Sequence, residues 1–309
     1  MADLMSEIIG SLGQGQGASL PWGWGTVIYY WLASIASFTF ITAFVASLLG
    51  RGDSWAVKWV IRLASPIAIF SLIAEATELG NPAAIYWIFS NMSSYLAIDA
   101  ASAVIFILAL LIYAFVPRLH RYVRGALGWI VAAAATVWLI GRTGLLITAS
   151  TRPFLALSSM PALLLISSVM LGMATLALTW SLGAFTGRKD TLDDLVRLNS
   201  LIASSIPVFA FILGFQILGA LYGGETLTKS ATLLISGASS PIFWTGVILG
   251  LTIPGVTYII IMYGFKRKMS ERAKYAAFIL ATTLLVVGML LLLGALFSAG
   301  LRTPLPGEA

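Results

Sequence analysis

The sequence predicts an all-α integral membrane protein. Of its 309 residues, 59% are hydrophobic and only 10% are charged, and the mean hydropathy is +0.97. A soluble domain of this length carries a much larger share of charged residues. Eight apolar stretches are each long enough to cross a bilayer. Since lipid offers no hydrogen-bond partner to exposed backbone groups, each stretch is predicted to be a helix.

The eight helices follow a polar, Gly- and Gln-rich lead-in over residues 1–22 and precede a short tail over residues 301–309. The N-terminal segment carries no positive charge, so no cleavable signal peptide is predicted. Pro66, Pro207 and Pro254 fall within the second, sixth and seventh helices, where proline is expected to introduce kinks. The helices are placed near residues 25–49, 56–78, 94–116, 125–148, 158–184, 199–222, 241–264 and 274–299.

The basic residues predict the orientation of these helices. The connections after the first, third, fifth and seventh helices, with the adjoining helix ends, hold most of the eighteen Lys and Arg residues, while the other side has only Arg142, Arg152, Lys229 and Arg302. Positive charge favours the cytoplasmic side of short loops. Both termini are therefore predicted to lie outside. Basic charge that only orients helices gives no reason to expect a nucleic-acid partner.

The scarcity of metal-binding residues excludes several cofactors. The chain has no cysteine, so it cannot bind an iron–sulfur cluster through thiolates or form a disulfide. His120 is the only histidine, and it lies in a basic connection. Membrane-bound haem b usually needs several histidines on facing helices. We therefore expect neither haem nor an iron–sulfur cluster on this chain.

Three of the twelve acidic residues, Glu75, Glu78 and Asp99, gather at the end of the second helix and the start of the third. Carboxylates at bilayer depth are costly unless they are paired, hydrated or protonated, so a membrane protein that keeps three together is expected to use them. The same corner includes Asn81. This corner is the predicted active site.

Arg142 is predicted to share the depth of these carboxylates. It lies about eighteen residues past the inner start of the fourth helix, hence roughly 27 Å into a hydrocarbon core about 30 Å thick. Tyr29 and Tyr30 lie in the first turns of the first helix, which begin at the same side. These groups are therefore expected to form one polar layer just beneath the outer surface.

Glu75 and Glu78 are three residues apart and so share a helical face. Two adjacent carboxylates favour a nearby cation, and Arg142 is the only basic residue at that depth, so Glu75 or Glu78 is its expected partner. An ion-paired helix end without chemistry would also explain the group. The number of polar residues in one layer favours a functional site.

A lipid-soluble quinol is a substrate that suits such a layer. Its oxidation releases protons to nearby acceptors, and its head group needs hydrogen-bonding groups in an apolar slot near the interface. Its electrons would leave through a partner, because the chain contains no redox centre. The residues that offer suitable donors and acceptors are Tyr29, Tyr30, Asn81, Glu75, Glu78, Asp99 and Arg142.

Several segments in order resemble the NrfD/polysulfide reductase membrane-subunit family. Residues 22–37, Trp-Gly-Trp-Gly-Thr-Val-Ile-Tyr-Tyr-Trp-Leu-Ala-Ser-Ile-Ala-Ser, resemble its first helix. Glu78-Leu-Gly-Asn-Pro82 resembles the element that closes its second helix, and Asn91-Met-Ser-Ser94 the start of its third. Arg142-Thr-Gly-Leu-Leu146 resembles a Tyr-x-Gly-Leu-Leu element in its fourth helix, followed by Pro153 and Met160-Pro161. The resemblance covers roughly residues 20–265.

The resemblance implies two four-helix bundles, over residues 23–150 and 151–300. It implies a menaquinone or ubiquinone site at the outer face of the first bundle. It also implies two partners, an iron–sulfur electron-transfer subunit and a molybdopterin catalytic subunit, in the reduction of sulfur compounds or nitrite at the cell membrane. By this resemblance Glu75, Glu78 and Asp99 would take protons, and Tyr29, Tyr30, Asn81 and Arg142 would bind the quinone.

The chain departs from the family at two places. Arg142 stands where the family has a quinone-binding tyrosine, and Ala33, Ser34 and Ser37 replace a run of glycines. The quinone site is then either remodelled, with Arg142 polarising a ring carbonyl, or lost.

Two other functions remain open. A proton- or ion-coupled transporter would use the same carboxylates, and it would need a polar path continuing across the membrane. The second half offers mainly Asn199, Gln216, Thr252 and Tyr258, which suit helix packing. A structural anchor with a decayed quinone site is the other alternative, in which neutralising Glu75 or Glu78 would change stability but not electron flow.

Overall fold

The computed structural model describes residues 24–77, 86, 88–116, 120–148, 152–186, 192–264 and 270–300. Within these residues the regular structure is entirely helical. The elements are α2 (Trp24–Ala46), η1 (Ser47–Arg51), α3 (Trp55–Ala76), α4 (Tyr95–Phe115), α5 (Arg121–Ile147), α6 (Met160–Phe185), α7 (Leu192–Leu221), α8 (Glu225–Ile235), α9 (Ser240–Val247), η3 (Ile248–Thr252), α10 (Ile253–Gly264) and α11 (Glu271–Ala299).

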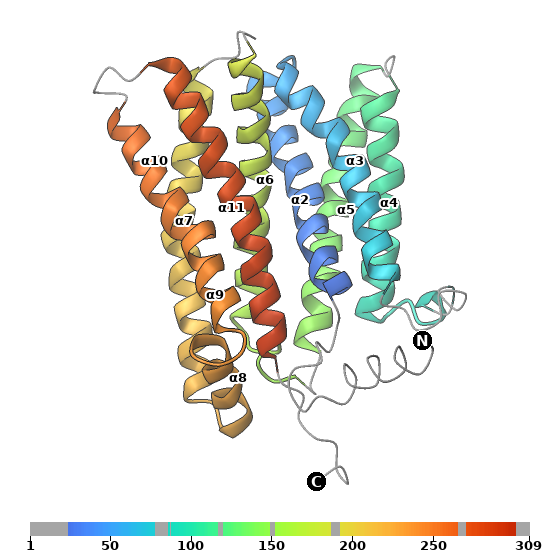
Figure 1. Ribbon diagram of the computed structural model, residues 1–309. Coiled ribbons are helices and arrows are strands. Elements are labelled where there is room, and N and C mark those ends of the chain that lie inside the picture. Colours follow the sequence, from blue (N-terminus) through green and yellow to red (C-terminus); the bar gives the residue numbers. More distant parts are fainter. Residues whose placement is uncertain are drawn as a thin grey trace, which may run out of the picture.

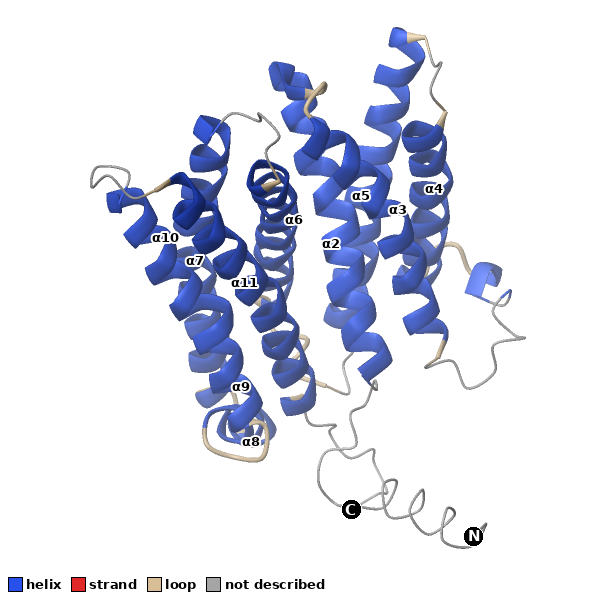
Figure 2. Ribbon diagram, turned by 45° about the horizontal axis from the view of Figure 1, so that its top comes forward, coloured by secondary structure: helices blue, strands red, loops and turns tan. Residues whose placement is uncertain are grey.

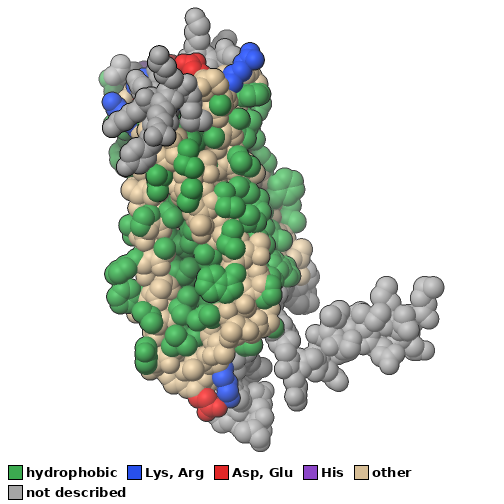
Figure 3. All heavy atoms as spheres, turned by 60° about the vertical axis from the view of Figure 1, so that its left-hand side comes forward, with side chains coloured by type: hydrophobic (Ala, Val, Ile, Leu, Met, Phe, Trp, Pro, Cys, Tyr) green, Lys and Arg blue, Asp and Glu red, His purple; other side chains and the backbone are tan. Residues whose placement is uncertain are grey.

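Eight helical segments in the described part of the chain are long and apolar enough to cross a membrane, which confirms the predicted number. Figure 3 shows one face of the molecule, on which the charged side chains lie near the two ends and apolar side chains cover the region between. This distribution is expected for a surface that contacts lipid. The segments are Trp24–Arg51, Trp55–Ala76, Tyr95–Phe115, Tyr122–Ile147, Met160–Phe185, Asp194–Leu221, Ser240–Met262 and Glu271–Ala299.

Two features differ from the prediction. The helix α7 begins at Leu192, ahead of the predicted residue 199, because a helix can extend beyond the apolar segment that marks its crossing of the bilayer. The short helix α8 was not predicted. Its eleven residues are too few to cross a bilayer, and Lys229 bonds Glu225 one turn away at 2.6 Å.

The helices of the two halves form one continuous assembly (Figures 1 and 2). The helix α6 lies between α7, α10 and α11 on one side and α2 to α5 on the other, and it contacts both α2 and α11. Because α2 also contacts α11, the division into two separate four-helix bundles stays a prediction. Figure 1 shows α2 beginning and α11 ending at the same end of the molecule. That this end faces outward stays a prediction from the charge distribution.

The seventh span contains a π turn, η3, immediately before Pro254. Proline has no backbone N–H and crowds the carbonyl of the preceding turn, so a widened turn at this point relieves the conflict. The backbone of η3 lies against α11 at Gly250 and Gly288, where a Cβ added to Gly288 would lie 2.1 Å from the Gly250 nitrogen. Small residues permit this close approach of two membrane helices.

Replacing Gly288 with alanine is expected to destabilise the protein by roughly 1–3 kcal/mol, because the methyl group would force η3 and α11 apart. Gly214→Ala is the matched control, since an added Cβ there meets no atom within 4 Å. Thermal unfolding in detergent should show a lower midpoint for Gly288→Ala and an unchanged or higher one for Gly214→Ala. Equal midpoints for the two variants would contradict the assigned close contact.

Candidate functional site

Four of the predicted site residues form one buried cluster near the end of the molecule where α2 begins. Tyr29, Tyr30, Asp99 and Arg142 come from α2, α4 and α5. Their exposed fractions are 1%, 3%, 5% and 1%. The polar layer deduced from helix positions is therefore also a set of neighbouring side chains.

A close approach of α4 and α5 places Asp99 in this cluster. A Cβ added to Gly141 would lie 2.7 Å from the Asp99 backbone nitrogen and 2.8 Å from its Cα. Only a glycine permits two helices to approach this closely. The first turn of α4 is held by Ser94, whose hydroxyl accepts a hydrogen bond from the Ala97 amide at 3.1 Å. Asp99 follows in the next turn.

A chain of hydrogen bonds fixes the Asp99 carboxylate. The Trp138 indole N–H donates to the Tyr29 hydroxyl at 2.9 Å, and that hydroxyl donates to Oδ2 of Asp99. The other oxygen, Oδ1, is buried and has no hydrogen-bond partner among the described residues. Buried polar atoms without a partner are rare, and one in a native structure often marks a functional group. Asp99 is thus oriented through one oxygen, and the other is left available.

Arg142 connects α5 to α2 beside this chain. Its guanidinium donates to the Tyr30 carbonyl, the Ser34 hydroxyl and the Ser37 hydroxyl, each at 3.4 Å. The Tyr30 hydroxyl in turn donates to the Arg142 carbonyl at 2.9 Å. The Arg142 Cζ lies 4.9 Å from the centre of the Trp138 ring, a distance at which a cation and an aromatic face attract each other.

Arg142 was expected to pair with Glu75 or Glu78. The pair with Glu75 is not formed, and Glu78 lies outside the described residues, so that alternative stays a prediction. No carboxylate oxygen of the described residues lies within 4.0 Å of the Arg142 guanidinium. Its hydrogen bonds go to neutral oxygens, and Asp99 is the carboxylate with which it interacts electrostatically. Spacing along one helix cannot show which neighbouring helix supplies the partner of a buried charge.

Glu75 lies on the last turns of α3 and is partly buried. It interacts electrostatically with Tyr30, as Asp99 does, so Tyr30 is within reach of both carboxylates. Glu78 and Asn81, the other predicted members of this corner, lie outside the described residues. The predicted site is therefore described in five of its seven residues.

Several members of the cluster were not predicted from the sequence. Trp138 lies four residues before Arg142 on the same face of α5, a spacing that could have indicated it. Ser34 and Ser37 were noted only as replacements for glycine. Ser168 on α6 donates to Ser34 at 2.9 Å, and no local pattern indicates that contact. Of these hydroxyl groups, those of Ser34 and Ser37 accept hydrogen bonds from the guanidinium.

The cluster has the chemistry of a proton acceptor. It combines two tyrosine hydroxyls, one arginine charge and a buried carboxylate, one oxygen of which has no partner in the described segments. The arginine favours the ionised carboxylate, and the tyrosine bond holds it in one orientation. No group of three or more His, Cys, Asp or Glu residues in the described segments could hold a metal ion.

Comparison with known proteins identifies the family. No curated protein matches the chain significantly. A family model described as "Polysulphide reductase, NrfD" matches residues 13–304, a longer region than the resemblance seen in the motifs. The family comprises membrane subunits of oxidoreductase complexes. Since the match covers nearly the whole chain, this protein belongs to the NrfD family of polysulphide reductase membrane subunits.

Proposed function

We propose that this chain is the quinol-binding membrane subunit of a multi-subunit oxidoreductase. It takes up protons from the quinol and passes the electrons to an iron–sulfur partner subunit. The observation that carries this proposal is the Asp99 carboxylate, held through Oδ2 by Tyr29 and unpartnered at Oδ1 within the described structure. The terminal reaction, in sulfur-compound respiration, belongs to a molybdopterin-containing partner subunit.

The residues present fit a quinol in charge and in hydrogen-bonding character. Menaquinol or ubiquinol supplies two electrons and two protons when bound. Oδ1 of Asp99 would accept one proton, since no described residue forms a hydrogen bond with that oxygen. Glu75, at the edge of the cluster and within electrostatic reach of Tyr30, would accept the other. Glu78 keeps the role expected from the sequence, an alternative to Glu75 as the acceptor of that proton, and Asn81 keeps that of a head-group ligand.

Arg142 acts in this proposal by keeping Asp99 ionised. A carboxylate in an apolar surrounding loses its charge readily unless a cation is close. The guanidinium is held by α2 and by the Trp138 carbonyl, at 3.4 Å from each oxygen, so its charge stays near Asp99. Its donors already point to protein oxygens. A direct contact between Arg142 and a quinone carbonyl therefore stays a prediction.

Two polar residues of the second half, Gln216 and Asn199, have local partners, which favours this proposal over a transporter. The Gln216 amide donates to the Phe154 carbonyl at 2.7 Å and its oxygen accepts from Ser159, so it binds α7 to the connection between α5 and α6. Asn199 donates to the Leu195 carbonyl of its own helix at 2.8 Å. These contacts are those of helix packing. They do not extend the cluster toward the other side of the membrane.

Quinone-analogue titration of the purified complex tests the proposal. Saturable binding is expected in the wild type, together with co-purification of an iron–sulfur subunit. Tyr29→Phe is expected to weaken binding roughly 5–10-fold, because the loss of one hydrogen bond of about 1 kcal/mol leaves Asp99 without its orientation. The quinol hydroxyl would then face an Asp99 carboxylate that is no longer held in the orientation that accepts its proton.

Tyr258→Phe is the matched control for this titration. Tyr258 is as fully buried as Tyr29, and its hydroxyl has no hydrogen-bond partner within the described part of the chain. Its removal is expected to leave the titration unchanged. Absence of saturable binding in the wild type, or equal weakening by the two substitutions, would reject the proposed site.

A further inference from the structure

A large basic cavity lies at the end of the molecule opposite the Asp99 cluster. It has a volume of about 1010 Å³ and lies between the η1 turn, the start of α3, the end of α4 and the start of α5. The charged residues that line it are Lys58, Arg62, Arg124 and Asp53. Three cations and one carboxylate make this an attractive site for an anion. The function proposed above assigns nothing to it.

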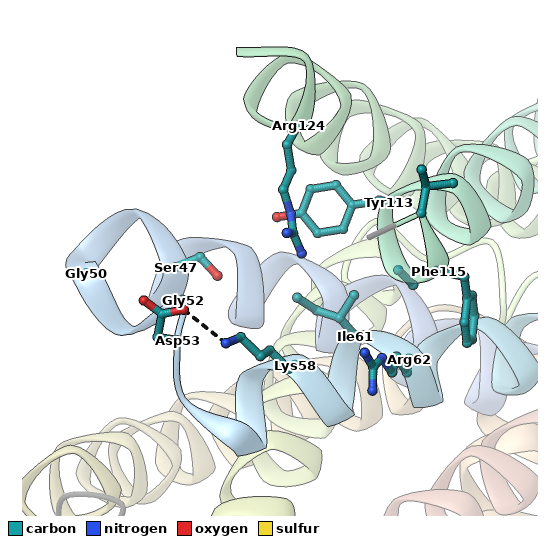
Figure 4. A pocket seen from close by; sticks show the side chains of 12 residues that line it. Ser47, Gly50, Gly52, Asp53, Lys58, Ile61, Arg62, Tyr113, Phe115 and Arg124 are labelled. Atoms are coloured by element: carbon teal, nitrogen blue, oxygen red, sulfur yellow. Dashed lines mark hydrogen bonds and ion pairs between the residues drawn. The ribbon is translucent and has the colours of Figure 1, made fainter. Parts of the chain in front are cut away.

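Two of the three cations are not neutralised within the described structure. Lys58 donates a hydrogen bond to Asp53 at 3.0 Å, and this bond holds the pKa of Asp53 below its usual value. The two side chains therefore form a charged pair with each other. Arg124 lies over the Tyr113 ring at 5.3 Å, and neither it nor Arg62 forms an ion pair with a described carboxylate. Figure 4 shows Arg124 extending from α5 toward Ile61, and the Asp53–Lys58 pair beside the η1 turn.

The basic cavity continues into an apolar groove. A second cavity of about 590 Å³ shares Arg62 and Phe115 with the first and runs between α3 and α4. Its other lining residues are Trp59, Leu63, Ser65, Pro66, Ile69 and Leu111. From Arg62 to Ile69 the helix advances roughly 10 Å toward the middle of the bilayer. Trp59, Leu63 and Ile69 are 42%, 38% and 40% exposed, so this wall is open to the lipid.

We infer that these two cavities together bind one anionic phospholipid, with its phosphate between Arg62 and Arg124 and an acyl chain along the groove between α3 and α4. The cations match the charge of the headgroup, and basic pockets between membrane helices suit such headgroups. The groove runs from the cations toward the middle of the bilayer, which is the direction that the acyl chain of a phospholipid takes from its headgroup. A soluble acidic segment of another protein would match the charges but has no apolar chain to fill the groove.

The lipid would fix the relative positions of α3 and α4 at this end. Lys58 and Arg62 belong to α3, Arg124 to α5, and Phe115 ends α4, so one bound molecule touches three helices. The same α3 and α4 carry Glu75 and Asp99 at their other ends. Bound lipid is therefore expected to stabilise the complex as a whole rather than to take part in its chemistry.

Lipid titration of the delipidated, purified complex tests this inference. Phosphatidylglycerol is expected to raise the midpoint of thermal unfolding and to remain bound in native mass spectrometry, whereas phosphatidylcholine should do neither. The double variant Arg62→Gln/Arg124→Gln is expected to bind phosphatidylglycerol roughly 30-fold more weakly, since each basic residue near the surface contributes about a fivefold factor. The double variant Arg62→Lys/Arg124→Lys should keep most of the affinity.

Two comparisons distinguish a lipid from other ligands. Arg272→Gln is the control, because Arg272 is also an exposed arginine, lies on α11 and lines neither cavity. The Arg272→Gln variant should bind phosphatidylglycerol as tightly as the wild type does. Inorganic phosphate should not raise the unfolding midpoint, and stabilisation by phosphate equal to that by the lipid would assign the cavity to a free anion. Equal affinity for the two lipids, or no loss in the glutamine double variant, would overturn the inference.

Discussion

Replacing Asp99 with asparagine is expected to lower quinol-dependent turnover of the purified complex by about 100-fold or more, the usual contribution of a positioned proton acceptor. The amide keeps the size of the carboxylate and can still accept the hydrogen bond from Tyr29, so the packing between α4 and α5 is retained. It cannot take a proton from the substrate. The measurement is the steady-state rate with a water-soluble quinol.

A bypass assay and a conservative variant separate this effect from misassembly. Reduced viologen delivers electrons to the partner subunits directly, so its oxidation should proceed at the wild-type rate in the Asp99→Asn complex. Asp99→Glu keeps the proton acceptor and should recover part of the activity. Quinol turnover of Asp99→Asn within threefold of wild type would show that Asp99 has a structural role only, as in an anchor whose quinone site has decayed.

The second large effect is expected for Arg142→Leu, which should destabilise the protein because it removes a cation that interacts with the buried Asp99 carboxylate. The substitution also removes the hydrogen bonds from α5 to Tyr30, Ser34 and Ser37 on α2. Breaking a buried charge interaction from one side costs more than removing both partners. In the background of Arg142→Leu, Asp99→Asn should therefore be less harmful to stability than it is alone.

A double-mutant cycle measures this coupling. The four proteins are the wild type, Arg142→Leu, Asp99→Asn and the combination, compared by thermal unfolding in detergent. Contacting buried groups commonly show coupling energies of about 0.5–3 kcal/mol. Arg142→Lys keeps the charge without the planar fork and should retain part of the coupling. Strictly additive effects would mean that Asp99 does not depend on the arginine charge.

The membrane architecture followed from the sequence because the bilayer permits so few solutions. An apolar stretch in lipid must satisfy its own backbone hydrogen bonds, so its composition and length alone predict a helix. The eight spans were predicted for this reason, as was the common depth of Tyr29, Asp99 and Arg142. By contrast, α8 was missed, because a short helix at the surface is stabilised by its contacts with α7, α9 and α11.

The sequence by itself determined that the chain has eight segments long and apolar enough to cross a membrane, and that Tyr29, Tyr30, Asp99 and Arg142 share one layer. Only the tertiary structure decided which of them meet. Gly141 lets α5 approach α4 at Asp99, Asp99 accepts a hydrogen bond from Tyr29 of α2, and Arg142 turns to α2 instead of Glu75. Depth depends on position along one helix, which a sequence records. Which side chains contact one another depends on how several helices pack and rotate. That arrangement is set only when segments distant in the sequence come together.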